Sequence, residues 1–85
     1  MIPRSLTPFF WDIDTATFEP RDHPEYTIER ILELGTPEAI AWLEGQFSEE
    51  QIKAVIRTDT RLSAKSATFW ALVYQIPDRD VAGLR

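Results

Sequence analysis

The chain has 85 residues, 44% of them hydrophobic, and a formal net charge of −5. This length gives one hydrophobic core, and the hydrophobic content excludes an intrinsically disordered chain. The absence of cysteine excludes disulfide bonds and thiolate metal sites.

The apolar segments of the chain bear on its location and domain organisation. The longest apolar run, Phe69 to Tyr74, is too short to span a bilayer, and the first residues lack the apolar core of a signal peptide. We therefore expect a soluble, cytoplasmic protein with a single small helical domain over residues 1–85. Its expected parts are an arm and loop, a helical body and a tail, at residues 1–22, 23–77 and 78–85.

The charge is divided unevenly along the chain. Residues 1–50 hold eleven acidic and three basic residues, whereas residues 51–85 hold three acidic and six basic ones. Acidic chains are poor general binders of nucleic acid, because phosphate neutralisation needs clustered Lys and Arg. Only a local patch in the second part could bind it.

The first eleven residues are rich in proline and aromatic residues and show no helical period. We expect an extended arm that either folds back over the last helix or anchors a partner protein. The two carboxylates that follow could hold magnesium, but two rarely suffice, so capping and surface charge are the expected roles. The candidate partner-binding residues are Phe9, Phe10, Trp11, Asp12 and Asp14.

Three amphipathic helices are predicted next. The first begins at Asp22 or His23 before Pro24 and ends at Gly35. The second begins at Thr36-Pro37, with Pro at the first helical position. The third begins at Ser48, where Gln51 completes a capping box. Their inward positions follow the helical spacing: Ile28, Ile31, Leu32, Ile40, Trp42, Leu43, Ile52, Val55 and Ile56.

The stretch from Leu62 to Ile76 predicts a fourth helix, capped by Ser63 and stopped by Pro77. It is apolar over most of its circumference, so we expect it to be central and covered on several sides, with Phe69 and Trp70 buried. The predicted fold is all-α: four short helices with helix-turn-helix-like pairs, preceded by the extended aromatic arm. No segment calls for a sheet.

Four basic residues recur at four-residue intervals around the third helix, the connector and the start of the fourth helix: Lys53, Arg57, Arg61 and Lys65. One interpretation is a patch at a helix-turn-helix-like corner that contacts nucleic acid or another phosphate group. The other is a solvated rim, which the residues alone favour.

Catalytic groups are sparse. His23 is the only histidine and has no visible catalytic partner, and the three glycines form no phosphate-binding loop. We therefore expect a protein that is not an enzyme and that has no metal site and no cofactor.

Three motifs carry a resemblance: F-F-W-D-I-D at 9–14, I-E-R-I-L-E-L-G at 28–35 and L-S-A-K-S-A-T-F-W at 62–70. The chain resembles a family of short prokaryotic proteins of unknown function with the motifs F-W-D-x-D, I-x-R-x-L-E-x-G and L-S-x-K-T-x-x-F-W. Its members are often found paired with AbiEii-type nucleotidyltransferase toxins and are presumed antitoxins. Here Ser66 stands in place of threonine, and 46–48 replaces a Tyr-Gly-type turn.

The resemblance implies an antitoxin-like protein that binds and neutralises a co-encoded nucleotidyltransferase-type toxin. Such a protein needs no catalytic group, and the acidic first half could imitate the phosphates that the toxin binds. Two other classes stay open: a DNA-binding regulator that uses the basic corner, with a homodimer as one form, and a structural or adaptor module. Salt-sensitive DNA binding would favour the regulator.

Overall fold

The protein is built from four α-helices in this computed structural model, which describes residues 3–10, 14 and 17–84. They are α1 (Pro24–Leu34), α2 (Pro37–Gln46), α3 (Glu49–Thr58) and α4 (Ala64–Val73). Short 3-10 helices flank them: η1 (Arg4–Phe10), η2 (Pro20–Asp22), η3 (Asp78–Asp80) and η4 (Ala82–Leu84). The described part contains no strand, so the predicted all-α class is confirmed.

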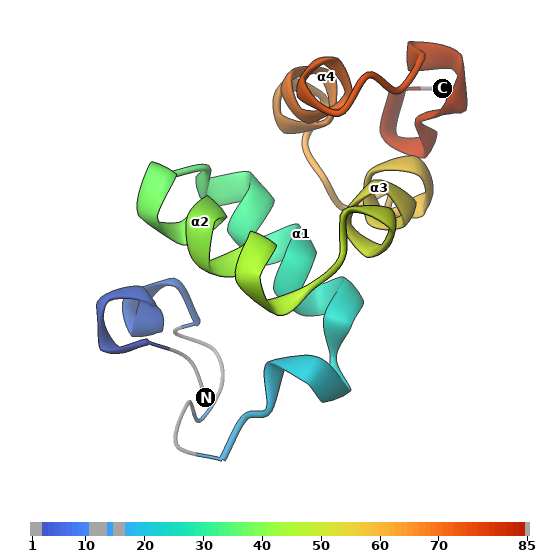
Figure 1. Ribbon diagram of the computed structural model, residues 1–85. Helices are drawn as coiled ribbons and strands as arrows, with labels where there is room; N and C mark the ends of the chain where they lie inside the picture. The colour runs from blue at the N-terminus through green and yellow to red at the C-terminus, as the bar shows by residue number, and fades with distance from the viewer. Residues whose placement is uncertain (1–2, 11–13, 15–16, 85) are drawn as a thin grey trace.

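The helices follow one another from one end of an elongated molecule to the other. Figure 1 shows η1 beside the α1–α2 pair, with α3 and α4 on the other side of that pair. The molecule measures 38 × 22 × 21 Å along its principal axes. Helix α1 contacts η1, α2, α3 and α4, so α1, rather than the predicted α4, is the central element.

The predicted helix starts are confirmed, because each rests on a local hydrogen bond or a local backbone restraint. Pro24 and Pro37 occupy first helical positions, where no amide hydrogen is needed. The hydroxyl of Thr36 accepts from the Ala39 N–H at 3.2 Å. Ser48 and Gln51 form the predicted capping box, with bonds of 3.2 and 2.9 Å.

Helix α4 ends at Val73, before the predicted end at Ile76. The Gln75 N–H donates to the Leu72 carbonyl at 3.2 Å, and the Ile76 N–H donates to the Ala71 carbonyl at 2.8 Å. This pattern is a Schellman motif, which requires a left-handed residue; Gln75 takes that role, with φ of 59°. The turn buries Ile76 directly before Pro77.

The N-terminal segment corrects the prediction of an extended arm. Residues Arg4–Phe10 form a 3-10 helix that lies against α1. Leu6 and Phe10 are both buried, and Phe10 packs against Phe18 and Tyr26 with ring centroids 5.9 and 6.2 Å apart. The segment is too short and has too few apolar residues to show a helical period in the sequence.

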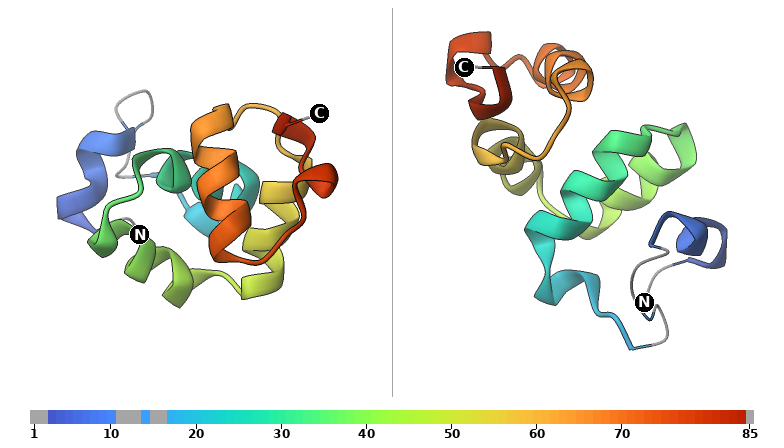
Figure 2. Two further views of the ribbon diagram at one scale, coloured as in Figure 1. Left: turned by 90° about the horizontal axis from the view of Figure 1, so that it is seen from above. Right: turned by 180° about the vertical axis from the view of Figure 1, so that it is seen from behind.

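The C-terminal segment also differs from the predicted polar tail. Its second 3-10 turn, η4, packs against α3 and α4, and η3 packs against η4, as Figure 2 shows from two sides. Val81, between η3 and η4, is completely buried. The segment therefore closes the core between α3 and α4. No helix in the described part of the chain has the length and apolar character that crossing a bilayer requires.

Helix α4 is covered on one side only, which corrects the prediction for Phe69. The buried side carries Ala67, Trp70, Ala71 and Tyr74. Phe69 is 54% exposed and lies on the opposite side. Two small alanines let α4 approach its neighbours closely, while the bulkier residues of the other side remain in solvent.

Replacement of two neighbouring aromatics tests this arrangement. Trp70→Ala should lower the free energy of unfolding by about 3–5 kcal/mol, because it removes a buried ring and leaves a cavity. Phe69→Ala should cost less than about 1 kcal/mol, since its ring is half in solvent. Urea denaturation measures both, and equal losses would contradict the assignment of the two faces.

The Schellman turn yields a second prediction. Gln75→Gly should raise the free energy of unfolding by about 0.5–1 kcal/mol, because glycine adopts positive φ without the strain of a Cβ atom and this gain exceeds its entropic cost. Gln75→Ala is the control, since it keeps the Cβ and should not stabilise the protein. A melting temperature for Gln75→Gly at or below that of the parent would contradict the prediction.

Candidate interaction surface

An exposed apolar surface runs along the outer side of α4. We call it the α4 strip and define it as Phe69, Leu72 and Val73, which are 54%, 78% and 51% exposed. Their spacing places them side by side on one helical face. Lys65 occupies the same face two turns before Leu72, and no acidic residue lies within α4.

The rotation of α4 about its axis is fixed by Trp70. Its indole N–H donates to the Leu32 carbonyl near the end of α1, at 2.8 Å. The Phe69 ring meets the Trp70 ring edge to face, with centroids 4.8 Å apart. Because Trp70 is buried and bonded, the strip is held outward on a rigid helix.

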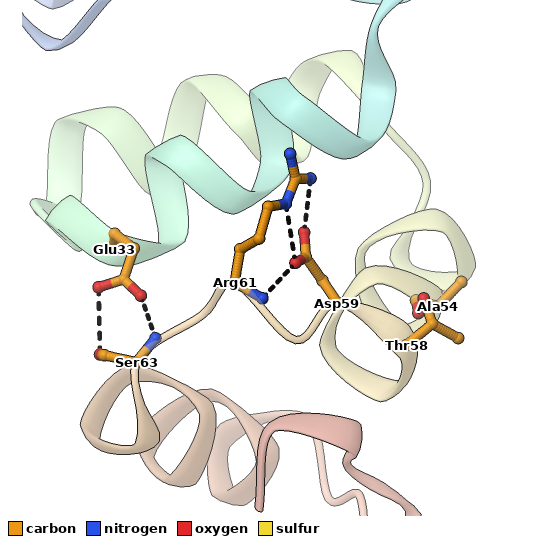
Figure 3. Close-up of polar contacts among 6 residues, drawn as sticks. All are labelled: Glu33, Ala54, Thr58, Asp59, Arg61 and Ser63. Carbon is orange, nitrogen blue, oxygen red and sulfur yellow. Dashed lines mark hydrogen bonds and ion pairs between the residues drawn. The ribbon is translucent and has the colours of Figure 1, made fainter.

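The start of α4 is attached to α1 by one carboxylate. Glu33 accepts from the backbone N–H of Ser63 and from its hydroxyl, the latter at 3.2 Å. It also accepts from the Ser66 hydroxyl at 2.9 Å. Figure 3 shows Glu33 directed at Ser63 from across the gap between the helices. The negative charge sits at the N-terminus of α4, where the helix dipole favours it.

The other end of α4 lies beside acidic residues. The Tyr74 hydroxyl donates to the Glu44 carboxylate at 3.1 Å. Burial, the hydrogen bond to Glu44 and the charges of Glu44 and Glu49 raise the pKa of Tyr74 to about 12. Tyr74, Glu44 and Glu49 line a surface depression of about 130 Å³ together with Phe47 and Ile52. These carboxylates lie on the side of Tyr74, opposite the exposed strip.

The four basic residues predicted as a patch are not equally available. The Lys53 ammonium lies 3.8 Å from the carboxylate of Glu49, which is one turn earlier on α3. Arg61 donates to both oxygens of Asp59, at 3.1 and 2.9 Å, as Figure 3 shows. Arg57 and Lys65 are exposed. Two of the four charges are therefore engaged with carboxylates, which weakens the case for a phosphate-binding corner.

The predicted N-terminal contact residues are only partly described. Trp11, Asp12 and the side chain of Phe9 lie outside the described residues. Phe10 is completely buried, so its ring is part of the core and is not on the surface where a partner would contact it. Asp14 is exposed, and its carbonyl accepts from the N–H groups of Thr17 and Phe18 at 3.2 and 3.1 Å.

The remaining candidates carry little chemistry. His23 is exposed and stacks on Phe18, with centroids 5.2 Å apart. A shallow depression of about 290 Å³ lies where Glu25, Thr58 and Arg61 meet. Within residues 3–10, 14 and 17–84, no cluster of His, Asp and Glu is arranged to hold a metal ion.

The α4 strip was missed because its residues were assigned to the core. The signal in the sequence was the position of the polar residues: Lys65 and Thr68 share the outer face with Leu72. Small Ala67 and Ala71 mark the opposite face as the one that packs closely.

The Asp59–Arg61 pair predicts a dependence of stability on pH. Burial acts to raise the pKa of Asp59, but the hydrogen bonds and charge of Arg61 outweigh it and hold the pKa below its ordinary value. The ionised carboxylate therefore stabilises the fold above the ordinary pKa of about 4, and this contribution disappears as the pH falls through the lowered value. Asp59→Asn should cost about 1 kcal/mol at neutral pH.

The measurement is urea denaturation near pH 6 and near pH 3. The difference between parent and Asp59→Asn should shrink at the lower pH, and an Arg61→Ala background should remove most of this pH dependence. A difference that is equal at both pH values would refute the proposed role of the pair.

Residues 6–56 match the family of unknown function DUF6922. The match extends from η1 to near the end of α3 and includes the motif at 28–35, whereas α4 lies beyond it. No curated protein and no solved structure matches the chain. Because the match covers more than half of the 85 residues, the chain belongs to DUF6922, a family of unknown function.

Proposed function

We propose that the protein acts by binding another protein through the α4 strip, and that its partner is a co-encoded nucleotidyltransferase-type toxin, which it neutralises. The observation that supports protein binding best is the exposure of Phe69, Leu72 and Val73 on one helical face. Adjacent exposed apolar side chains of this size are typical of contact surfaces.

The rigidity of α4 favours the same conclusion. Glu33 and Trp70 fix the helix at two points along its length. A contact surface that is already ordered loses little conformational entropy when it binds. Leu72, the most exposed residue of the strip, is the natural anchor for a pocket in the partner.

The identity of the partner rests on the resemblance described above and on charge. The eleven acidic residues in 1–50 give the protein a field that attracts a basic, nucleotide-binding cleft. Phe9, Trp11, Asp12 and Asp14 remain predicted additional contacts, whereas Phe10 is withdrawn because it is buried.

A DNA-binding role has weaker support. In the α3–α4 pair, α4 would be the helix that reads base edges, and such a helix needs hydrogen-bond donors and acceptors on its outer face. Its outer face carries only Lys65 and Thr68 as such groups, beside the apolar Phe69, Leu72 and Val73.

Leu72→Asp tests the proposal. Binding to the purified product of the adjacent gene should weaken by about 2 kcal/mol or more, roughly thirtyfold, because a charge would enter an apolar contact. The melting temperature should barely change, since Leu72 is 78% exposed. Isothermal titration calorimetry and a growth assay with the co-expressed toxin measure the two effects.

Ala54→Asp is the matched control. Ala54 is exposed on α3, near the start of α1 and away from the strip, so the same charge should leave binding unchanged. If Leu72→Asp binds and neutralises as well as the parent, the strip is not the binding surface. If the parent forms no complex with the adjacent gene product, the toxin partner is wrong.

A further inference from the structure

We propose that the seam between α1 and the connector at 59–63 is a pH-sensitive switch that is stronger in mild acid than at neutral pH. The group that operates it is Glu29, which is half-buried on α1 and is acted on by charges of the connector. Because the connector leads directly into α4, the switch sets how firmly α4 is attached to α1. The switch belongs to the free protein, so it goes beyond the proposed function and does not depend on a partner.

Three carboxylates follow one another along this side of α1. Glu25, Glu29 and Glu33 are spaced four residues apart, so they lie above one another on one face of the helix. Like charges at this spacing repel each other and destabilise a helix. Glu33 is compensated by the amide and hydroxyl hydrogens of Ser63 and by the Ser66 hydroxyl.

The connector offers one cation to this face, and a carboxylate of the connector already engages it. Arg61 is the only basic residue at 59–63, and Figure 3 shows its guanidinium directed toward α1. Its Nε and Nη2 atoms donate to Asp59 at 3.1 and 2.9 Å. The Glu29 carboxylate accepts no hydrogen bond from the described part of the chain. Asp59 and Glu29 thus compete for one guanidinium, and Asp59 holds it.

The surroundings of Glu29 favour its neutral form. Burial raises the pKa of Glu29 above its ordinary value, and the charges of Asp59 on the connector and Glu33 on α1 add to this shift. The charges of Arg61 and Arg30 oppose the shift only in part. These four residues are the charged groups of the connector and of α1 that act on Glu29. An ionised Glu29 is therefore a poorly compensated charge within the seam.

The sign of the switch follows from this preference. The folded protein binds a proton at Glu29 more tightly than the unfolded chain does, so protonation stabilises the fold. This contribution is fully present below the ordinary pKa of 4.5 and is lost as the pH rises through the raised pKa. Asp59 has the opposite sign, because its pKa is lowered and its contribution is lost only in stronger acid. The seam is therefore strongest in the mildly acidic range between the two.

Thermal denaturation near pH 7 and near pH 5 tests the sign. Glu29→Gln keeps the size of the side chain and removes its charge, so it should raise the melting temperature near pH 7 by about 2–4 °C. The gain should shrink near pH 5, where the parent carries the proton itself. Glu50→Gln is the matched control, because Glu50 is exposed at the end of α3 that lies away from the connector, and it should give no gain.

Hydrogen exchange locates the effect in the molecule. The protection of the Trp70 indole N–H, corrected for the intrinsic effect of pH on exchange, should rise between pH 7 and pH 5 in the parent but not in Glu29→Gln. The Phe47 N–H at the end of α2 is the reference, since it lies outside the seam. An equal rise at both groups would show a global effect and overturn the switch.

NMR titration of the Glu29 side-chain carboxyl carbon tests the competition for Arg61. The pKa of Glu29 should fall in Asp59→Asn, which weakens the hold on the guanidinium, and should rise in Arg61→Gln, which removes it. Burial alone predicts no shift in either variant. The parent provides a measurement that no variant can obscure: if its Glu29 titrates at or below the ordinary pKa, the switch does not exist. A Glu29→Gln variant that is no more stable than the parent near pH 7 would also rule it out.

Discussion

The hydrogen bond from the Trp70 indole to the Leu32 carbonyl is the interaction on which the arrangement of this protein depends. It joins the end of α1 to the middle of α4 at 2.8 Å and lies in the core. An unsatisfied indole N–H in this position would cost the free energy of its lost solvation, so the ring has one favourable orientation. That orientation decides which residues of α4 face outward.

Glu33 makes the second set of hydrogen bonds between α1 and the start of α4. It is the last acidic residue of α1, and its carboxylate serves Ser63 and Ser66 at the start of α4. A carboxylate near the C-terminus of its own helix is unfavourable, but the same charge lies at the N-terminus of the next helix, where it is favourable. The two helices thus share one charge, and the short connector at 59–63 is held in place by Asp59 and Arg61.

Local signals in the sequence predicted the helix starts, and non-local packing decided the features that were not predicted. Thr36, Ser48 and Ser63 each bond to a backbone N–H three residues onward, so their roles depend on neighbours in the chain alone. The outward direction of Phe69 depends instead on where Trp70 finds a carbonyl, which is 38 residues away. Because α4 is apolar around most of its circumference, its sequence alone does not indicate which side will be buried.

The segments at 4–10 and 78–84 also could not be predicted from the sequence, because their structure depends on non-local packing. Leu6 and Phe10 are buried in η1, which packs against α1, and Val81 is buried directly before η4, which packs against α3 and α4. Each of these segments has few apolar residues and gives a weak periodic signal. The sequence likewise gives the four basic residues of the predicted corner but not their partners. In the fold, Glu49 pairs with Lys53 and Asp59 pairs with Arg61.

The burial of Val81 has a consequence for the order of events during synthesis. Helix α4 packs against η4, which directly follows the buried Val81, and η4 is synthesised after α4 itself. Until then, the nascent helix has an incompletely covered inner side in addition to its outer strip. At translation rates of about 5–20 residues per second, this interval lasts on the order of a second. Helix α4 is therefore most prone to aggregate in the interval between its own synthesis and that of η4.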